Sequence, residues 1–306
     1  MSSAFAIAEA GVVMPQLLSP VGELGTSLKV EALTNAHQDE VLAFLSLRPI
    51  HTVCMTGYIR DNGIVSPLNR GLFYSCRDEA GRLQGVALIG HATLLETQSD
   101  EALQAFAELK HEYSCSHLVR GEHEMIARFW HYYSEFGHTP RLARRELLYE
   151  LRTAPPIEGS AHELQPATAD DLEEIITINA GMIWSECGID PLKKDPVGFQ
   201  ERLACRIKQR RIWLWKKDGR LIFKADVFAQ TPAMSYVEGV YVDKQERRQG
   251  HGLHCMSQLA RILLQYSQSI CLLINQQKQE LATFYEEAGY RKRGTYDTFY
   301  LHPEAN

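Results

Sequence analysis

The stretch ERRQGHGLHCM (residues 246–256) places two glycines and two arginines where a helix begins, because apolar residues at helical spacing follow it. Amide groups in the first turn of a helix have no partner within the helix, and the helix dipole adds a positive partial charge there. Gly250 and Gly252 leave this backbone accessible, and Arg247 and Arg248 add formal charge. The pattern predicts a pyrophosphate-binding site.

Three motifs could produce such a site. A P-loop would need Gly-Lys followed by Ser or Thr, which the chain lacks. A Rossmann fingerprint would need a third glycine after the first strand of a βαβ unit, whereas the runs before residue 246 indicate antiparallel strands. The third motif, R-x-x-G-x-G, is met at residues 247–252, directly after the run VEGVYVD. The alternative is a basic, exposed helix start that binds no ligand.

The elements around this motif form a mixed α/β pattern. Thr168 and Asp171 resemble a capping box, and Asp218-Gly219 joins two β-rich runs as a hairpin would. The first expected helix begins after Thr168 and ends at about Met182. Three more are expected at about 196–209, after residue 250 and at 278–290. The expected strands flank the hairpin and cover 235–242, 269–275 and 294–301.

The run RTAPPIEGSAH (residues 152–162) reads as a linker, since it holds two prolines and no periodicity. Before it, a helix at about 36–47 precedes another hairpin, with Gly-Arg-Leu at 81–83 as at 219–221. HYYSEFG near residue 135 also matches TFYEEAG near residue 287. We therefore expect an internal duplication. The first twenty residues lack the basic start of a signal peptide and are interpreted as a mobile or strand-forming lead.

The strand, the R-x-x-G-x-G motif and the helix ATFYEEAGY together resemble the GNAT N-acetyltransferase superfamily over about residues 165–303. The duplication resembles tandem-GNAT proteins, whose N-terminal copy is often degenerate. This resemblance implies an α/β fold of two GNAT-like domains, each with a mixed, largely antiparallel sheet flanked by helices. The expected domains are a degenerate copy at 1–152 and a catalytic acetyltransferase domain at 163–306.

The resemblance also implies acetyl-CoA as the acyl-donor cosubstrate and a primary amine as the acceptor. The strand backbone before the motif would polarise the thioester, the loop amides would hold the pyrophosphate, and an asparagine would contact the pantetheine arm. The residues carried over for acetyl-CoA binding are Val240, Tyr241, Val242, Arg247, Arg248, Gln249, Gly250, His251, Gly252, Leu253 and Asn275. Many family members have Asn where this chain has Lys278, so a contact at that position is in doubt.

Two residues are candidates for proton transfer. Glu238 lies on the strand before the motif, where a carboxylate beside a cleft can accept an amine proton. Its structural alternative is an ion pair with Lys224 or Arg220, and Asp226 is the reserve base. Tyr285 matches the family tyrosine that protonates the departing thiolate, and its alternative is an ordinary packing role.

The acceptor side is less defined. In the family, the first two helices and their connection border the acceptor pocket. This segment here reads IWSECGIDP (183–191), in which Trp184, Glu186 and Asp190 could receive a cationic amine, although an ordinary loop is equally consistent. The acceptor is expected to be a small-molecule or peptide amine. A second hypothesis is a non-catalytic CoA-binding sensor or interaction protein.

Composition restricts the partners. The net charge of −6 gives no overall attraction to nucleic acid or membrane surfaces, and no run reaches the roughly 18 apolar residues of a membrane span. The seven cysteines are scattered, which is typical of a reducing, cytoplasmic compartment. His251, His254 and Cys255 lack the further ligands of a metal site, so no metal is expected. The oligomeric state is open between a monomer and a homodimer.

The N-terminal copy lacks the glycine-arginine loop and instead has HATLLETQSDEALQAFAELK. Ser99 and Asp100 can cap the helix predicted there, and a side-chain cap occupies the amides that a pyrophosphate would need. Glu96, Asp100 and Glu101 would also repel a phosphate. We therefore expect this copy to shape the acceptor cleft, to steady the catalytic half or to mediate association.

Overall fold

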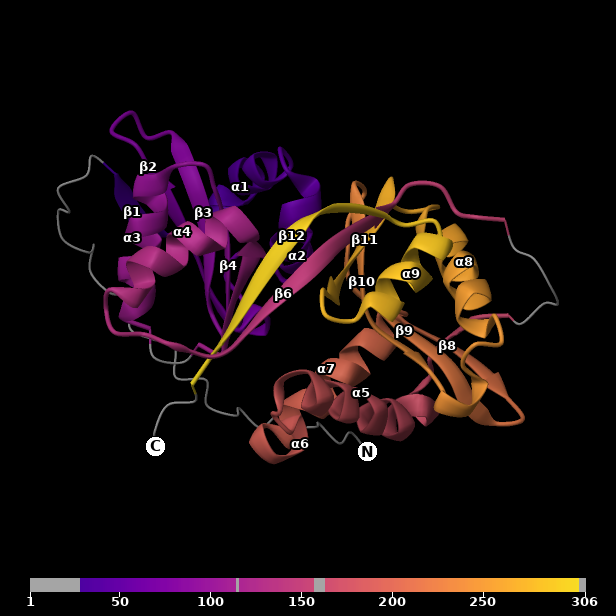
Figure 1. Cartoon of the computed structure of the whole chain (residues 1–306). Helices are drawn as coiled ribbons and strands as arrows, with labels where there is room; N and C mark the ends of the chain where they lie inside the picture. Colours follow the sequence, from indigo (N-terminus) through magenta and orange to yellow (C-terminus); the bar gives the residue numbers. More distant parts are fainter. Residues whose placement is uncertain (1–27, 114–115, 157–162, 303–306) are drawn as a thin grey trace, which may run out of the picture.

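The computed structural model describes residues 28–113, 116–156 and 163–302, and within them the strands form one twelve-stranded sheet with helices on both faces (Figure 1). The strand order is β1-β2-β3-β4-β5-β12-β6-β11-β10-β9-β8-β7. The strands are β1 (Lys29–Ala32), β2 (Gly71–Arg77), β3 (Leu83–Gly90), β4 (Ala92–Thr97), β5 (Leu118–Glu122), β6 (Pro140–Leu151), β7 (Gln165–Pro166), β8 (Ile212–Lys217), β9 (Arg220–Gln230), β10 (Met234–Val242), β11 (Ser269–Asn275) and β12 (Arg291–Leu301).

The helices lie between groups of these strands along the chain. They are α1 (Gln38–Leu45), α2 (Pro49–Asn62), α3 (Asp100–His111), α4 (His123–Ser134), α5 (Leu172–Cys187), α6 (Pro191–Lys194), α7 (Pro196–Lys208), α8 (His251–Leu263) and α9 (Gln279–Glu287). In the described part of the chain, none of them has the length and apolar character that crossing a lipid bilayer requires.

Apart from the additional short helix α6 in the second, the same order of elements occurs twice, from β1 to β6 (the N-terminal half) and from β7 to β12 (the C-terminal half). The matching glycines have matching conformations: φ is 76° at Gly81 and 78° at Gly219 in the two hairpin turns. It is 83° at Gly137 after α4 and 86° at Gly289 after α9. Glycine adopts this left-handed conformation without a steric penalty, which explains why both copies of each motif have glycine at this position. The predicted duplication is confirmed in the fold.

The two halves exchange their last strands at the centre of the sheet (Figure 1). Strand β6 pairs with β11 of the C-terminal half, and β12 pairs with β5 of the N-terminal half. The two exchanged strands also pair with each other along almost their whole length. Each half therefore needs the other to complete its sheet.

The helices divide between the two faces of the sheet. On β6, Leu147 and Tyr149 pack with the cluster under α8 and α9, whereas Leu148 packs with α2 on the opposite face. Phe299 of β12 pairs with Ala143 of β6, shares the face of Leu147, and packs with the cluster under α3 and α4. One face thus carries α3, α4, α8 and α9, and the other carries α1, α2 and α5–α7.

The elements predicted around the R-x-x-G-x-G motif are all present, with boundaries shifted by a few residues. The largest difference is α5, which continues beyond Met182 to Cys187 and ends at Gly188, where φ is 68°. The short helix α6 occupies part of the connection that follows. The N-terminal lead (1–20) lies outside the described residues, as does 157–162 of the linker.

Gly57 and Gly181 both lie inside helices, and they make a matched test of how α2 packs. A Cβ atom on Gly57 would lie 2.6 Å from Cβ of Ala229 on β9, so Gly57→Ala should lower the free energy of unfolding by roughly 1–3 kcal/mol. Gly181→Ala meets no atom within 4 Å and should raise it by about 0.5–1 kcal/mol. Urea unfolding measures both, and shifts of the same sign would contradict the close contact.

Candidate functional site

Strands β10 and β11 run in parallel but are paired only at Met234–Tyr236 of β10, although this strand continues to Val242. The register with β9 shifts between Glu238 and Tyr241, where Gly239 has a φ of 60°. This is a β-bulge, a feature that bends a strand and ends regular pairing. The predicted residues 240–242 therefore lie on a backbone segment that is not paired with β11, and its polar groups on that side can serve a ligand.

A buried ion pair holds this bulge in place. Lys224 is 0% exposed, and its Nζ donates to Asp226 Oδ1 at 2.6 Å and to the carbonyl of Gly239 at 3.0 Å. Asn179 Nδ2 donates to the second Asp226 oxygen at 3.1 Å. Burial lowers the pKa of Lys224, and Asp226 opposes that shift. Asp226, the reserve base, is thus engaged in a structural network, and a Cβ on Gly239 would collide with it at 2.7 Å.

Glu238 lies on the α2–α7 face and forms an ion pair with Arg206 of α7, with 2.9 Å between Oε1 and Nη1. The side chain of Glu238 remains 32% exposed. The two partners considered from the sequence are both bonded elsewhere, Lys224 to the bulge and Arg220 to Asp243. An accessible carboxylate therefore stands next to the bulge, oriented by a guanidinium.

The N-terminus of α8 has the open backbone that the sequence predicts. Gly250 is the N-cap with a φ of 82°, no side chain caps the helix, and no atom lies within 4 Å of the position a Cβ would take. Arg248 also has a positive φ, 61°, and its side chain is exposed. Arg247 Nε donates to the carbonyl of Val242 at 3.1 Å, which ties the loop to the end of β10.

Gly252 has a different role from Gly250. A Cβ at this position would lie 3.0 Å from the ring of Phe284 and 3.3 Å from the side chain of Val242. The absence of a side chain therefore lets α8 pack closely against α9 and β10. The sequence interpretation assigned both glycines to ligand access, and the close packing at Gly252 is a second reason for a glycine there. This contact also makes the loop, the end of β10 and α9 one contiguous region.

The remaining predicted residues of the loop are tied into the protein. Gln249 donates to a backbone carbonyl four residues earlier at 3.1 Å. The ring of His251 lies 4.8 Å from that of Trp215, and its Nε2 is 3.4 Å from Glu246 Oε2. Leu253 packs against the core under α8. These contacts fix the shape of the loop.

Tyr285 on α9 is 6% exposed and packs edge-to-face with Phe284 and Tyr290. Burial raises its pKa, so the hydroxyl keeps its proton at neutral pH. Asn275 ends β11, and its Oδ1 accepts from the amide of Gln277 at 2.9 Å, which begins the turn into α9. Tyr285 belongs to the α8–α9 face and Glu238 to the other, so the sheet separates them except where β10 and β11 are unpaired.

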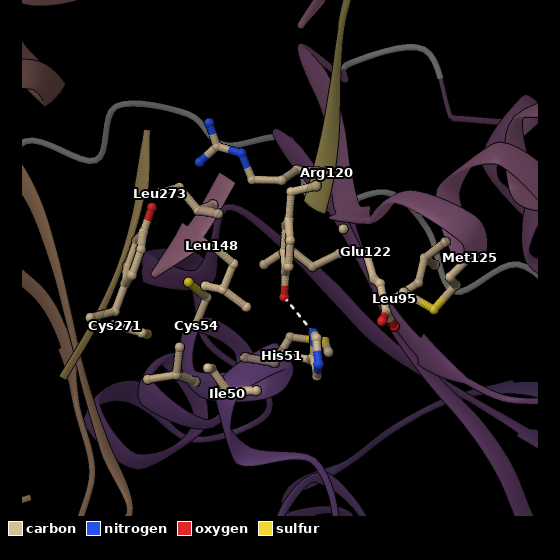
Figure 2. A pocket seen from close by; sticks show the side chains of 16 residues that line it. Ile50, His51, Cys54, Leu95, Arg120, Glu122, Met125, Leu148, Cys271 and Leu273 are labelled. Carbon is tan, nitrogen blue, oxygen red and sulfur yellow. Dashed lines mark hydrogen bonds between the residues drawn. The ribbon is translucent and has the colours of Figure 1, made fainter. Parts of the chain in front are cut away.

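A small cavity of about 40 Å³ lies between α2 and the centre of the sheet, as Figure 2 shows. Cys54 and His51 of α2 line it from one side, and Cys271 and Leu273 of β11 line it from the other. His51 Nδ1 lies 2.9 Å from the hydroxyl of Tyr296 on β12. Burial raises the pKa of Cys54 to about 12. Tyr236, two residues before Glu238 on β10, also lines the cavity, which therefore lies next to the Glu238 region.

The segment predicted to border the acceptor pocket is only partly suited to that role. Trp184 is 59% exposed, and Asp190 caps α6 by accepting from the amide of Leu192 at 3.0 Å. Of the three residues of this segment, Glu186 is the one that interacts with charges near Glu238. Glu186 is exposed at the surface, but desolvation by neighbouring protein atoms raises its pKa, and its charged neighbours include Arg120 and Glu238.

The N-terminal half repeats the glutamate–arginine pair of this site but not the uncapped helix start. Glu96 lies two residues beyond the last parallel pair of β4 with β5, as Glu238 does on β10. Arg48 Nη1 is 3.1 Å from Glu96, a counterpart of the Arg206–Glu238 pair. No glycine loop follows, and Ser99 Oγ accepts from an amide in the first turn of α3 at 3.2 Å. The predicted cap is confirmed for Ser99, whereas Asp100 is the first residue of α3 and accepts from Tyr132 and Arg128 instead.

Sequence reasoning missed the role of Arg206 and of the Lys224–Asp226 pair. The pair had a visible signal, because LIFKADVFA carries two charges within an otherwise apolar run. Arg206 had none, since its contact with Glu238 joins a helix and a strand that are 32 residues apart.

The sequence matches a known protein family, and the fold matches solved structures. Residues 170–290 match the model of the acetyltransferase (GNAT) family. No curated protein sequence matches the chain. The GCN5-related N-acetyltransferase from Sphaerobacter thermophilus superposes with a TM-score of 0.60 at 12% identity, covering 93% of this chain and 99% of that one.

Two further solved structures share the fold over most of the chain. A GNAT-family acetyltransferase from Colwellia psychrerythraea has a TM-score of 0.56 at 11% identity and covers 90% of this chain and 100% of that one. A tandem GNAT protein from the clavulanic acid biosynthesis pathway has a TM-score of 0.51 at 13% identity, with coverages of 91% and 100%. At these identities the likeness concerns the fold.

Removing Lys224 should unfold the bulge network. Lys224→Met leaves the buried Asp226 carboxylate without its main partner and should lower the free energy of unfolding by roughly 3–5 kcal/mol. The double variant Lys224→Met with Asp226→Leu should recover most of that loss. Lys216→Met is the matched control, because Lys216 pairs with Asp171 at 2.6 Å near the surface and should cost at most about 1 kcal/mol. Equal losses at the two lysines in urea unfolding would contradict this account.

Proposed function

We propose that the protein is an acetyl-CoA-dependent N-acetyltransferase acting on a primary amine, since residues 170–290 match the model of the acetyltransferase (GNAT) family. The observation that carries the proposal is the uncapped N-terminus of α8 beside the unpaired segment of β10. An anion-binding helix start and a free strand edge are the two features that a phosphate-bearing thioester needs from the backbone.

In this proposal the pyrophosphate of acetyl-CoA binds at the start of α8. Gly250 fits this role, since the space around it is open and no side chain competes for the first amides of the helix. The exposed Arg248 and the loop around Arg247 add positive charge at the approach. The pantetheine arm would follow the unpaired backbone of residues 240–242 toward Asn275.

The proposed reaction is direct attack of the amine on the thioester. The amine nitrogen bonds to the acetyl carbon, the carbon–sulfur bond breaks, and the amine proton passes to Glu238 directly or through water. Tyr285 then protonates the CoA thiolate. The ion pair with Arg206 supports this role for Glu238 by fixing its orientation. An ordinary phenol is protonated at neutral pH, so Tyr285 holds the proton that this step needs.

The acceptor would approach from the face that carries α2 and α7. Tyr58 of α2 packs on Phe228 at 5.6 Å between ring centroids, and Arg206 lies 4.9 Å from the same ring. The N-terminal half thus supplies a wall next to Glu238, in line with the expectation that it shapes the acceptor cleft. We propose residues 163–306 as the catalytic domain and 1–152 as a copy that binds no acetyl-CoA. A small-molecule or peptide amine is the proposed acceptor.

Release of free CoA thiol from acetyl-CoA, measured over a panel of primary amines, tests the function. Turnover that depends on an amine supports the proposal. Binding of acetyl-CoA without turnover on any amine would contradict it and favour a CoA-binding protein without catalytic activity.

Two substitutions of Gly250 distinguish the effect of added side-chain size from that of added charge. Asn and Asp have nearly the same size and both tolerate a left-handed φ, but only Asp adds a carboxylate where the pyrophosphate would bind. Isothermal calorimetry should find one acetyl-CoA per chain in the unmodified protein and a moderately weakened site in Gly250→Asn. In Gly250→Asp we expect no measurable binding. Two sites of similar affinity, or equal binding by both variants, would refute the assignment.

Tyr285 and its counterpart in the N-terminal half provide a second matched pair. Tyr285→Phe removes the proposed acid and should lower kcat by roughly ten- to a thousandfold, with little change in acetyl-CoA affinity. Tyr133→Phe removes a hydroxyl that accepts from Lys110 at 3.2 Å in the other half and should leave kcat unchanged. Steady-state kinetics at saturating acetyl-CoA measure both. Full turnover in Tyr285→Phe would exclude it as the acid.

A further inference from the structure

A row of basic side chains crosses one end of the sheet in the N-terminal half. Arg70 precedes β2, His91 joins β3 to β4, and His117 precedes β5. The amide of His91 donates to the carbonyl of Arg70 at 2.8 Å, and the amide of His117 donates to the carbonyl of His91 at 2.9 Å. These backbone bonds place the three side chains next to one another.

The C-terminal half adds Lys194 of α6 and Arg202 of α7 to this row. Lys194 Nζ lies 3.0 Å from His117 Nδ1, and Arg70 Nη2 lies 2.9 Å from His91 Nδ1. Lysine and arginine only donate, so both imidazoles accept at Nδ1 and carry their proton on Nε2. Burial beside these cations lowers the pKa of His91 to about 2 and that of His117 to about 4.

The charges in this cluster do not balance. Arg70, Lys194 and Arg202 are basic side chains, and burial lowers the pKa of Arg70 to about 10 and also lowers that of Lys194. Within the described residues, the carboxylate that forms an ion pair with one of them is Asp195, 2.9 Å from Arg202. Arg141 of β6 is among the charges that act on Lys194, and its Nε is buried without a hydrogen-bond partner in the described part of the chain. Partly buried cations are costly unless an anion compensates them.

The backbone around Arg70 is specialised as well. Arg70 has a φ of 55°, a left-handed conformation that costs a non-glycine residue roughly 1–2 kcal/mol. Gly71 pairs with Gly90, and a Cβ on Gly90 would lie 2.3 Å from the carbonyl oxygen of Arg70. An arginine thus occupies a position where glycine would be less strained, which points to a role for its side chain.

We propose that Arg70, His91, His117, Lys194 and Arg202 form a binding site for a phosphate group at the seam between the two halves. The guanidinium and ammonium groups supply charge-assisted hydrogen bonds to a tetrahedral oxyanion, and each imidazole offers an Nε2–H donor. The site is separate from the start of α8 and does not depend on the proposed catalytic function.

Calorimetric titration at constant ionic strength tests the site, with inorganic phosphate in one arm and glycerol phosphate in the other. Arg70→Gly removes the side chain while suiting the left-handed backbone, so the protein should stay folded and the Kd should rise at least tenfold. Lys194→Met should have a similar effect. Lys193→Met removes an adjacent, exposed lysine and should leave the Kd unchanged.

Binding in both arms identifies a phosphomonoester group as the ligand, and binding of inorganic phosphate alone identifies the free anion. The absence of phosphate binding to the unmodified protein would overturn the proposal. So would a Kd that is unaffected by Arg70→Gly and Lys194→Met, or binding that disappears in Gly250→Asp, because that phosphate would occupy the start of α8 instead.

Discussion

The exchange of β6 and β12 is the constraint on which the rest of the structure depends. Each strand completes the sheet of the opposite half, so the two halves share one hydrogen-bonded sheet and bury its centre together. This geometry brings α2 of the N-terminal half onto β9 and β10, where Gly57 allows close contact with Ala229. The surroundings of Glu238 therefore contain residues from both halves, although the start of α8 belongs to one.

The two halves differ in the residues that follow the glutamates of β4 and β10. Both place a glutamate beyond the last parallel pair and hold it with an arginine, Arg48 to Glu96 and Arg206 to Glu238. After that residue, β10 bulges at Gly239 and continues to a helix without a cap, whereas β4 ends and Ser99 caps the next helix. A few residues, rather than the architecture, thus decide in which half the first amides of this helix are left without a side-chain cap.

Sequence patterns predicted features that depend on neighbours along the chain. The hairpin glycines, the periodic helices and the start of α8 follow from backbone conformation and local spacing, and they are found where expected. Contacts between distant segments escaped prediction. The pairing of Glu238 with Arg206, the strand exchange and the placement of α2 depend on how the halves pack, and no local pattern encodes that. Gly252 shows the same limit, since its packing against Phe284 is invisible in the motif.

The unpaired segment of β10 is also what links the two faces of the sheet. Tyr285 lies on the α8–α9 face and Glu238 on the α2–α7 face, so a continuous sheet would keep them apart. The bulge is stable because Lys224, which is fully buried, donates both to the buried carboxylate of Asp226 and to the carbonyl of Gly239. A charged pair inside the sheet is expensive to bury unless its hydrogen bonds are satisfied. Here it is satisfied by the irregular backbone itself, so the ion pair and the opening in the sheet stabilise each other.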